Sequence, residues 1–392
     1  MFRLAKIFTN RKFVTFLWFG LSLFAIVKQA LANHINNYQI YKYTFINLIH
    51  QNNLYTAQPQ HFEDLNHYGP LFSLMIAPFT FLPDYLGVIL WTMANAYVLY
   101  KAILMLPLKQ QQLTAVLLIS AHELMTASYG EQVNPAIAAL IILSFVFINR
   151  KQDWLATLMI VIGTLIKLYG IVGVAFFFFS KKKPQFIISF FVWMAVLLAL
   201  PMLVTSPHFV LQCYHDWFIS LRDKNIANES SVMQNISVMG MISKIFAYPQ
   251  LSNLLVLVPA MLLFASSYLR IKSFKETPYQ LLILASTLIF TVIFSTGSES
   301  PTYIIAFAGV AIWFINLGRR PTGFEIFLLV FALIITSLSP SDIFPQSINR
   351  NFIRPYALKA LPCLLIWLKI VVEALTRNFD NKEVPQQTEI LI

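Results

Sequence analysis

Apolar runs, each about as long as a membrane-spanning helix, follow one another along almost the whole chain and leave no stretch for a separate water-soluble domain. A helix that crosses a bilayer needs about 20 apolar residues. Only 11% of the 392 residues are charged and 58% are hydrophobic, so the chain lacks the charge that a soluble surface requires. We therefore expect an all-α, polytopic integral membrane protein with about 12 transmembrane helices. One membrane domain is expected over residues 1–375, followed by a polar cytoplasmic tail over residues 376–392.

Lysine and arginine residues are concentrated in short clusters between the apolar runs. The positive-inside rule places such clusters in the cytoplasm, and it places the N-terminus there as well. The same rule accounts for the net charge of +11, so nucleic-acid binding is not expected. The clusters are Arg3 to Lys12, Lys101 with Lys109, Arg150 with Lys151, Lys181 to Lys183, Arg270 with Lys272 and Lys275, Arg319 with Arg320, and the tail from Arg377.

Each pair of apolar runs between two basic clusters has to return to the cytoplasmic side. The expected pairs are 113–128 with 134–149, 186–205 with 251–269, 279–296 with 301–317, and 323–338 with 356–375. Their outer turns form the outer face, together with residues 33–70 and a long loop over residues 206–250. Residues 71–106 leave the number of crossings open, because Pro78 and Pro83 interrupt the run.

One helical face is predicted in the first outer segment. Tyr38, Tyr41, Phe45 and Leu48 recur at steps of three and four residues, which places them on one side of a helix. Polar residues flank this face, so we expect an amphipathic helix that lies in the membrane interface. A helix packed on the rest of the protein is the alternative interpretation.

A charged residue interrupts the apolar sequence between Lys151 and Lys181. At Lys167 to Gly170 this sequence divides into two pieces that are too short to span a bilayer, which indicates two short helices that meet in a recessed outer cavity. A charge within membrane sequence marks a candidate functional site, and the Lys167 ammonium could face a lipid phosphate. A lysine whose side chain extends to the interface is the alternative.

Acids and amides collect on the expected outer face. The stretch from His61 to Pro83 passes without a linker from a polar loop into apolar sequence, and it carries Asp64 and His67. These side chains could exchange protons at the membrane surface. Glu131 and Glu299, each beside a Gly or Pro, could position sugar hydroxyls or act as a base. Solvated loop acids are the alternative for both.

Several of these segments, in this order, resemble glycosyltransferase family 87, the polyprenyl-phosphate-mannose-dependent mannosyltransferases of the GT-C superfamily. The segments are Asn37 to Tyr41, His67 to Pro70 continuing to Trp91, Gly130 to Asn134, Lys167 to Tyr169, and a fifth at Asn235 to Gly240. The resemblance extends over about residues 13–375. It implies a GT-C-like fold with an interfacial helix in the first outer loop, in the bacterial plasma membrane. It also implies a set of substrate-binding residues, which are Asn37, Tyr41, His67, Tyr68, Gln132, Asn134, Lys167, Tyr169 and Asn235.

The activity that the resemblance implies is transfer of a hexose, with mannose expected, from a polyprenyl-phosphate donor to a glycolipid or glycan acceptor, by direct displacement with inversion. The leaving lipid phosphate needs a cation, for which Lys167 is the first choice and Arg222 or Lys224 the second. No cofactor is expected, since no glycine-rich phosphate loop and no Asp-x-Asp pair is visible. No metal is expected, since the histidines and the two cysteines show no ligand spacing.

Two positions depart from the family pattern. Where the first outer loop of the family has the aspartate that serves as base, this chain has Asn37, and an amide cannot accept a proton. Where the late outer loop of the family has a histidine, this chain has residues 298–303, Ser-Glu-Ser-Pro-Thr-Tyr. Either the base has moved to one of four acids, which are Glu63, Asp64, Glu131 and Glu299, or the chemistry is weakened. Asp64 is favoured, because it lies in the same loop as Asn37 and precedes His67 at the membrane boundary.

Two other functional classes stay open at the level of sequence. A lipid-linked sugar flippase or transporter would also have many spans and a lysine within membrane sequence. The acids on one face favour an enzyme, and the inverted repeats typical of transporters are not visible. A noncatalytic membrane assembly subunit would be consistent with Asn37 in place of the aspartate.

Overall fold

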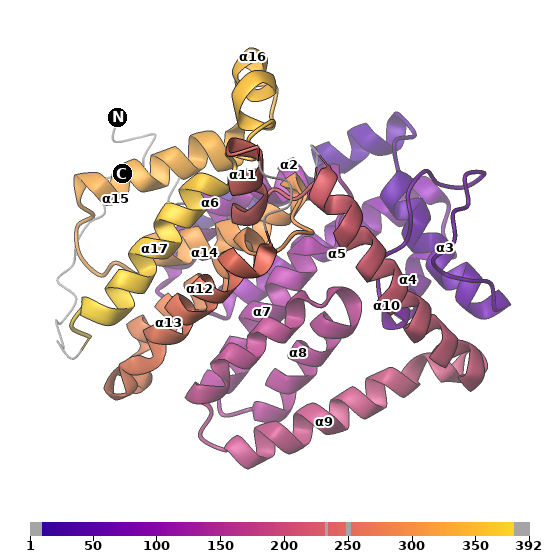
Figure 1. Cartoon of the computed structure of the whole chain (residues 1–392), viewed down its shortest axis with the longest axis horizontal. Coiled ribbons are helices and arrows are strands. Elements are labelled where there is room, and N and C mark those ends of the chain that lie inside the picture. The colour runs from indigo at the N-terminus through magenta and orange to yellow at the C-terminus, as the bar shows by residue number, and fades with distance from the viewer. Residues whose placement is uncertain (1–9, 232–233, 248–251, 380–392) are drawn as a thin grey trace. The chain divides into compact units, whose positions relative to one another are not determined.

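The structure is a computed structural model that describes residues 10–231, 234–247 and 252–379. Within these residues every regular element is a helix, as predicted (Figure 1). The helices are α2 (Arg11–Leu31), α3 (Asn36–His50), α4 (Pro70–Thr80), α5 (Asp84–Leu104), α6 (Gln110–Tyr129), α7 (Asn134–Asn149), α8 (Asp153–Lys167), η1 (Tyr169–Phe179), α9 (Lys183–Ala199), η2 (Leu200–Leu203), α10 (Pro207–Ser230), α11 (Val238–Ile245), α12 (Asn253–Ser266), η3 (Ser267–Leu269), η4 (Ile271–Lys275), α13 (Thr277–Ile293), η5 (Ser300–Thr302), α14 (Tyr303–Ile315), α15 (Gly323–Phe331), η6 (Ala332–Leu338), α16 (Gln346–Ile348), η7 (Asn349–Ile353) and α17 (Ala360–Thr376).

The chain forms two compact units. Unit 1 comprises Met1–Trp18, Leu106–Glu123 and Asn228–Ile392, and unit 2 comprises Phe19–Met105 and Leu124–Ala227. Residues 380–392, which make up most of the predicted polar tail, lie outside the described residues.

Three helical stretches in the described residues are long and apolar enough to cross a membrane. They are Arg11–Leu31, Asp84–Leu104 and Lys183–Leu203, and seven shorter apolar stretches of 10–17 residues accompany them. These helices agree with a membrane-integral protein. Residues 71–106, for which the sequence left the number of crossings open, form most of α4 and all of α5. Pro78 lies inside α4, and Pro83 directly precedes α5. The count of about 12 spans stays a prediction.

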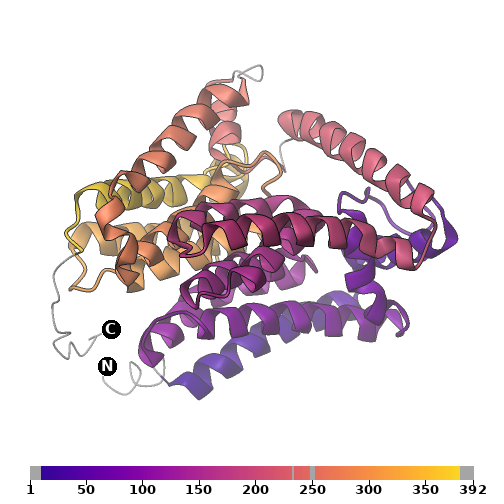
Figure 2. The ribbon, with the colours of Figure 1, turned by 90° about the horizontal axis from the view of Figure 1, so that it is seen from below.

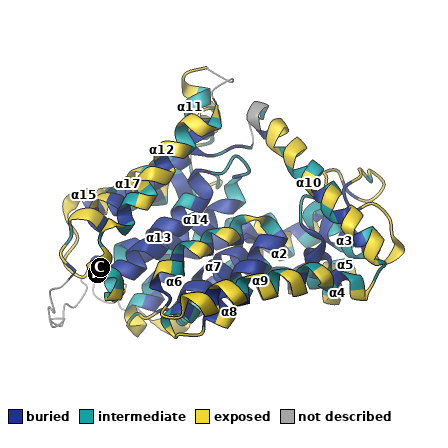
Figure 3. Ribbon diagram, turned by 60° about the horizontal axis from the view of Figure 1, so that its bottom comes forward, coloured by how far each residue is buried: buried dark blue, intermediate teal, exposed yellow. Residues whose placement is uncertain are grey.

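The core of unit 1 is the helix pair α13 and α14. Nearly every residue of both helices is buried, and α17 packs against both (Figure 3). Gly309 allows α14 to approach α13, because a Cβ atom at this position would lie 2.7 Å from the backbone oxygen of Ala285. Helices that are apolar on all sides are typical of central positions in a membrane protein.

Unit 2 is organised around α7, of whose 16 residues all but a few are buried. Helices α5 and α8 pack on α7, helix α9 packs on α8, and helix α3 packs on α4. The predicted polar segments around Tyr68, Gln132 and Lys167 lie at the ends of these helices. The arrangement in unit 2 therefore determines where those polar side chains meet.

The predicted break at Lys167 is confirmed. Helix α8 ends at Lys167, Leu168 adopts a left-handed conformation with φ 36°, and the 3₁₀-helix η1 begins at Tyr169. The two helices pack against each other as a hairpin. At Gly170 a Cβ atom would lie 2.4 Å from the carbonyl carbon of Gly163, so the two backbones touch at these glycines.

We expect Gly170→Ala to lower the stability of the protein by about 1–3 kcal/mol, because the added methyl group would force the two helices of this hairpin apart. Thermal unfolding in detergent would measure the loss as a lower midpoint temperature. Gly20→Ala is the matched control, since no atom lies within 4 Å of the Cβ position at Gly20. Equal midpoints for the two variants would contradict the close packing inferred at Gly170.

The predicted helix in the first outer segment is confirmed as α3. Tyr38, Tyr41 and Leu48 are fully or almost fully buried, and Phe45 is half-buried. The Tyr41 ring lies edge-to-face against Phe72, with ring centroids 5.0 Å apart. The predicted face therefore packs on protein, which was the alternative interpretation, while a position of α3 in the membrane interface stays a prediction.

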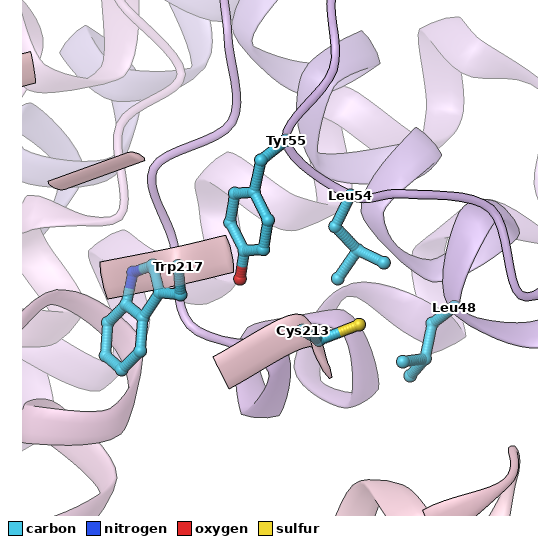
Figure 4. Packing of buried hydrophobic residues seen from close by; sticks show 5 residues of the cluster. All are labelled: Leu48, Leu54, Tyr55, Cys213 and Trp217. Atoms are coloured by element: carbon cyan, nitrogen blue, oxygen red, sulfur yellow. The ribbon is translucent and has the colours of Figure 1, made fainter. Parts of the chain in front are cut away.

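The expected long loop over residues 206–250 is mostly helical, which corrects that prediction. Helix α10 is a single continuous helix of 24 residues (Figure 2), and α11 follows it. The average hydrophobicity of α10 is low, so no apolar run in the sequence marks this helix. Cys213 and Trp217 of α10 pack with Leu48, Leu54 and Tyr55 in one buried cluster (Figure 4). This cluster fixes α10 against α3 and the loop that follows α3.

Candidate active site

Five predicted substrate-binding side chains form one continuous chain of hydrogen bonds in unit 2. The contacts, in order, are Tyr41 Oη to Tyr68 Oη at 3.1 Å, Tyr68 Oη to Gln132 Oε1 at 3.3 Å, Asn134 Nδ2 to Gln132 Oε1 at 3.4 Å, and Lys167 Nζ to Asn134 Oδ1 at 2.9 Å. The side chains come from α3, the loop before α4, the loop before α7 with the first residue of α7, and the end of α8. We call these five residues the polar network.

Lys167 stands at the turn of the α8–η1 hairpin and is half-buried. Besides its hydrogen bond to Asn134, its ammonium lies 5.8 Å from the ring centroid of Tyr68 and 5.3 Å from that of Tyr169. An ammonium over the face of an aromatic ring is stabilised by the ring quadrupole. The structure thus holds a positive charge between two tyrosine rings, at the edge of the polar network.

Glu131 fixes the loop between α6 and α7 to the first turn of α3. Its carboxylate oxygen Oε2 accepts a hydrogen bond from the backbone N–H of Tyr38 at 2.7 Å, and its backbone oxygen accepts one from the Trp91 indole at 3.0 Å. A carboxylate at a helix N-terminus is stabilised by the exposed N–H groups there. Only 3% of the Glu131 surface is exposed. Glu131 is therefore a buried cap of α3.

Asn37 contacts the same loop through an amide donor. Its Nδ2 donates a hydrogen bond to the backbone oxygen of Gly130 at 2.9 Å. An aspartate at this position could not donate that bond, and its charge would be added next to Glu131. The geometry therefore gives a physical reason for an amide at the position where the family pattern has an acid.

The buried carboxyl of Glu131 should give the stability of the protein a pH dependence. Burial raises the pKa of Glu131 from the usual 4.5 to about 7, although the N–H groups of Tyr38 and Asn37 oppose that rise. The folded protein then binds this proton more tightly than the unfolded chain, so the free energy of unfolding falls as pH rises from 4.5 to about 7.

We expect the midpoint of thermal unfolding to be higher at pH 5 than at pH 7.5, with Glu131 responsible for part of the difference. Glu131→Gln keeps an acceptor oxygen for Tyr38 but does not titrate. Its midpoint should therefore change less between the two pH values than that of the wild-type protein. If the midpoint of Glu131→Gln changes between the two pH values as much as that of the wild-type protein, the Glu131 carboxyl has the same pKa in the folded and unfolded states.

His67 is held by hydrogen bonds to side chains of α10, and the charges of one acid and two lysines act on it. Its Nδ1 is 2.7 Å from Ser220 Oγ, and its backbone oxygen accepts a hydrogen bond from the Trp217 indole at 2.9 Å. Burial lowers the pKa of His67 to about 4; the charges of Lys224 and Lys167 add to this effect, and that of Asp64 opposes it. His67 is therefore neutral at pH 7.

Asp64 is exposed at the rim of this region. Its Oδ1 accepts a hydrogen bond from the N–H of Leu65 at 2.8 Å, and its charge acts on His67. The charge of Lys167 acts on the same imidazole. The charges of an exposed carboxylate and a half-buried ammonium thus act in opposite directions on one neutral histidine.

The two remaining predicted site residues, Asn235 and Glu299, lie in unit 1. Asn235 has a left-handed backbone with φ 55°, and its Oδ1 accepts a hydrogen bond from Ser237 Oγ at 2.6 Å. The N–H of Ile236 donates to the backbone oxygen of Ser298 at 2.8 Å. The structure therefore brings the segments of Asn235 and Glu299 side by side.

Sequence reasoning missed several side chains that support the site. Trp217 and Ser220 hold the His67 loop, and the signal for them was the spacing of Val210, Cys213 and Trp217 along one helical face of α10. Trp91, which binds the backbone of Glu131, was noted only as the end of a segment. In the described part of the chain no group of three or more His, Cys, Asp or Glu could hold a metal ion.

One comparison with known protein families gives a match. A sequence model described as Glycosyltransferase family 87 matches residues 66–296. This range includes four members of the polar network, all except Tyr41, and begins two residues after Asp64. No match was found among curated proteins.

Proposed function

Since the chain belongs to glycosyltransferase family 87, we propose that it transfers mannose from a polyprenyl-phosphate donor to a glycolipid or glycan acceptor, with inversion at the anomeric carbon. Membership in the family makes the protein a membrane glycosyltransferase. The sugar, the lipid carrier and a reaction at the outer face of the bacterial plasma membrane, with the N-terminus in the cytoplasm, are parts of the proposal. The polar network is the observation that carries it, because it joins four separate segments of the chain around one cation.

Lys167 is the proposed partner of the donor phosphate. A phosphate oxygen can accept a charge-assisted hydrogen bond from its ammonium, and such bonds are about twice as strong as those between neutral groups. The hydroxyls of Tyr41 and Tyr68 and the amides of Gln132 and Asn134 can bind sugar hydroxyls as donors and acceptors. Lys224, which also acts on His67, is the proposed second cation.

Asp64 is the proposed base. Glu131 is buried and its carboxylate is engaged by the N-terminus of α3, whereas Asp64 is exposed and can reach an acceptor from water. In the proposed step the acceptor hydroxyl gives its proton to Asp64, its oxygen forms a bond to the anomeric carbon, and the bond from that carbon to the phosphate oxygen breaks. The electron pair leaves with the polyprenyl phosphate, which Lys167 stabilises.

The proposal is tested with the purified full-length chain in lipid nanodiscs that contain polyprenyl-phosphate mannose and a glycan acceptor. The expected result is release of polyprenyl phosphate that depends on the acceptor and equals the mannose transferred. A donor with glucose in place of mannose tests the identity of the sugar. In sealed vesicles, movement of the donor between leaflets without release of phosphate would overturn the proposal in favour of a flippase.

A further inference from the structure

The turn that carries His67 is held between two helices of unit 2. On one side, the N–H of Gly69 donates a hydrogen bond at 3.1 Å to the backbone oxygen of Ile166, the residue before Lys167. On the other side, the Trp217 indole of α10 donates to the backbone oxygen of His67 at 2.9 Å. A Cβ atom at Gly69 would lie 2.9 Å from the Trp217 ring, so the contact with α10 is close. The turn is therefore fixed against the helix end that carries Lys167.

Ser220 of α10 makes two hydrogen bonds to the same turn. Its Oγ lies 3.1 Å from the backbone oxygen of Asn66 and 2.7 Å from Nδ1 of His67. A backbone oxygen can only accept, and a serine hydroxyl has a single hydrogen to donate. The hydroxyl therefore donates to Asn66 and accepts from His67, which places a proton on Nδ1 of the imidazole.

The second ring nitrogen of His67 is then an acceptor. A neutral imidazole carries one proton, and the hydrogen bond that one nitrogen makes determines the state of the other. Burial lowers the pKa of His67 to about 4, so the ring is neutral at pH 7. With its proton on Nδ1, the ring has a lone pair on Nε2, and within the described part of the chain no side chain donates a hydrogen bond to this atom.

This acceptor nitrogen lies next to the residues of the proposed site. Tyr68, the following residue, belongs to the polar network, and its ring centroid lies 5.8 Å from the Lys167 ammonium. The charges of Lys167 and Asp64 both act on His67, which is half-buried. The oxygens of an ionised phosphate are acceptors and cannot donate to Nε2, whereas a hydroxyl group can. A sugar hydroxyl is therefore the substrate group that fits this nitrogen.

We propose that Ser220 is a positioning residue, which fixes His67 as the tautomer with its proton on Nδ1, so that Nε2 accepts a hydrogen bond from a sugar hydroxyl. This inference rests on the proposed function in one respect, that the protein binds the sugars of a donor and an acceptor. The hydroxyl belongs either to the donor sugar or to the acceptor, and separate ligands distinguish the two. Ser220 acts only through His67.

The tautomer is measured by nitrogen NMR of the full-length chain in lipid nanodiscs, with isotopically labelled histidine. The His67 resonances are identified by their loss in His67→Asn. We expect a protonated Nδ1 and an unprotonated Nε2 in the wild-type protein. Ser220→Ala removes the acceptor of the Nδ1 proton, so resonances of the opposite tautomer should appear. Ser220→Thr keeps the hydroxyl and should keep the wild-type tautomer. A wild-type proton on Nε2, or an unchanged spectrum in Ser220→Ala, would overturn the proposal.

Ligand additions test what binds to Nε2. Polyprenyl-phosphate mannose and a mannose-terminated glycan are added separately, and at least one of them should shift the Nε2 resonance of His67. A shift with the first assigns the hydroxyl to the donor sugar, and a shift with the second assigns it to the acceptor. Polyprenyl phosphate without a sugar is the control and should leave Nε2 unchanged. An Nε2 resonance that responds to neither sugar ligand, or equally to the lipid phosphate alone, would rule out the hydroxyl contact.

One substitution separates the bond to Ser220 from the bond proposed at Nε2. In His67→Asn the amide nitrogen can replace Nδ1 as the donor to Ser220, but no atom replaces Nε2. The midpoint of thermal unfolding should therefore stay close to the wild-type value. The dissociation constant of the ligand that shifts Nε2 should rise about 2- to 12-fold, which corresponds to one neutral hydrogen bond. Ser220→Ala should raise the same constant, and Ser220→Thr should restore it. A wild-type constant in His67→Asn would contradict the role of Nε2.

The matched control is Ser206, which precedes α10 and donates to Gln51 Oε1 at 3.0 Å. Ser206→Ala also removes a serine hydroxyl from unit 2, and it should leave the His67 tautomer and the dissociation constants unchanged. A tautomer change as large as that of Ser220→Ala would contradict a specific role of Ser220. If the wild-type protein transfers no sugar from any polyprenyl-phosphate donor, the proposed function fails. The tautomer and binding measurements need no transfer, so they still decide the role of Ser220.

Discussion

Replacing Asp64 with Asn is expected to lower the rate of sugar transfer by about 10²- to 10⁴-fold, which is the usual contribution of a positioned general base. The substitution keeps the shape of the side chain and an acceptor oxygen for the N–H of Leu65. Donor binding should therefore stay close to the wild-type value. The measurement is kcat for release of polyprenyl phosphate at saturating donor and acceptor.

Glu131→Gln and Glu299→Gln are the controls for this experiment. Glu131→Gln retains an acceptor for the Tyr38 N–H, so we expect only a small change in rate. A collapse of activity in either control, with normal turnover in Asp64→Asn, would place the base in a later loop. A rise in activity in Asn37→Asp, with all three acids dispensable, would indicate a site whose base has been lost.

Replacing Lys167 with Met is expected to weaken donor binding by about 10- to 150-fold, because a charge-assisted contact contributes about 1.5–3 kcal/mol. Methionine keeps most of the length of the side chain and removes its charge. The effect should appear in the dissociation constant of the polyprenyl-phosphate donor, measured in nanodiscs at low salt. A dissociation constant equal to that of the wild-type protein would contradict this role. It would favour the alternative interpretation, in which the Lys167 side chain extends to the membrane interface.

Two further substitutions test whether donor binding depends on a positive charge and whether that charge must be at position 167. Lys167→Arg keeps a cation beside Tyr68 and Tyr169, so it should bind the donor better than Lys167→Met. Lys224→Met removes the other cation that acts on His67, and its effect should be smaller than that of Lys167→Met. A larger effect for Lys224 would move the proposed phosphate position toward α10.

The membrane helices and the break at Lys167 could be predicted because each depends on local sequence alone. Hydrophobic length indicates a helix in the bilayer, and a lysine followed by glycine within apolar sequence indicates a break. The convergence of Tyr41, Tyr68, Gln132 and Lys167 was expected from the resemblance. Their individual contacts could not be predicted, because they depend on how α3, α7 and α8 pack in unit 2.

Helix α10 and a buried ion pair of unit 1, in which the Lys359 ammonium lies 3.2 Å from Glu123 Oε1, were missed for different reasons. Helix α10 buries a narrow stripe of side chains, so its apolar periodicity is diluted by polar residues and no apolar run marks it. The ion pair depends on a contact across 236 positions, which no local pattern encodes. Glu123 alone could have been noticed, since an acid within a predicted span is rare.

The α8–η1 hairpin has a further consequence for how such a protein would encounter its lipid substrate. Helix α8 has 15 residues and η1 has 11, so each arm is about 22 Å long, less than the roughly 30 Å of bilayer hydrocarbon. With both arms starting at the cytoplasmic side, as Lys151 and Lys181 predict, Lys167 would stop about 8 Å short of the opposite surface. The proposed lipid donor would approach this position by lateral diffusion within one leaflet, with its phosphate at the membrane surface. Turnover would then follow the mole fraction of donor in the bilayer, and thicker membranes would slow it by lifting the phosphate plane away from the ammonium.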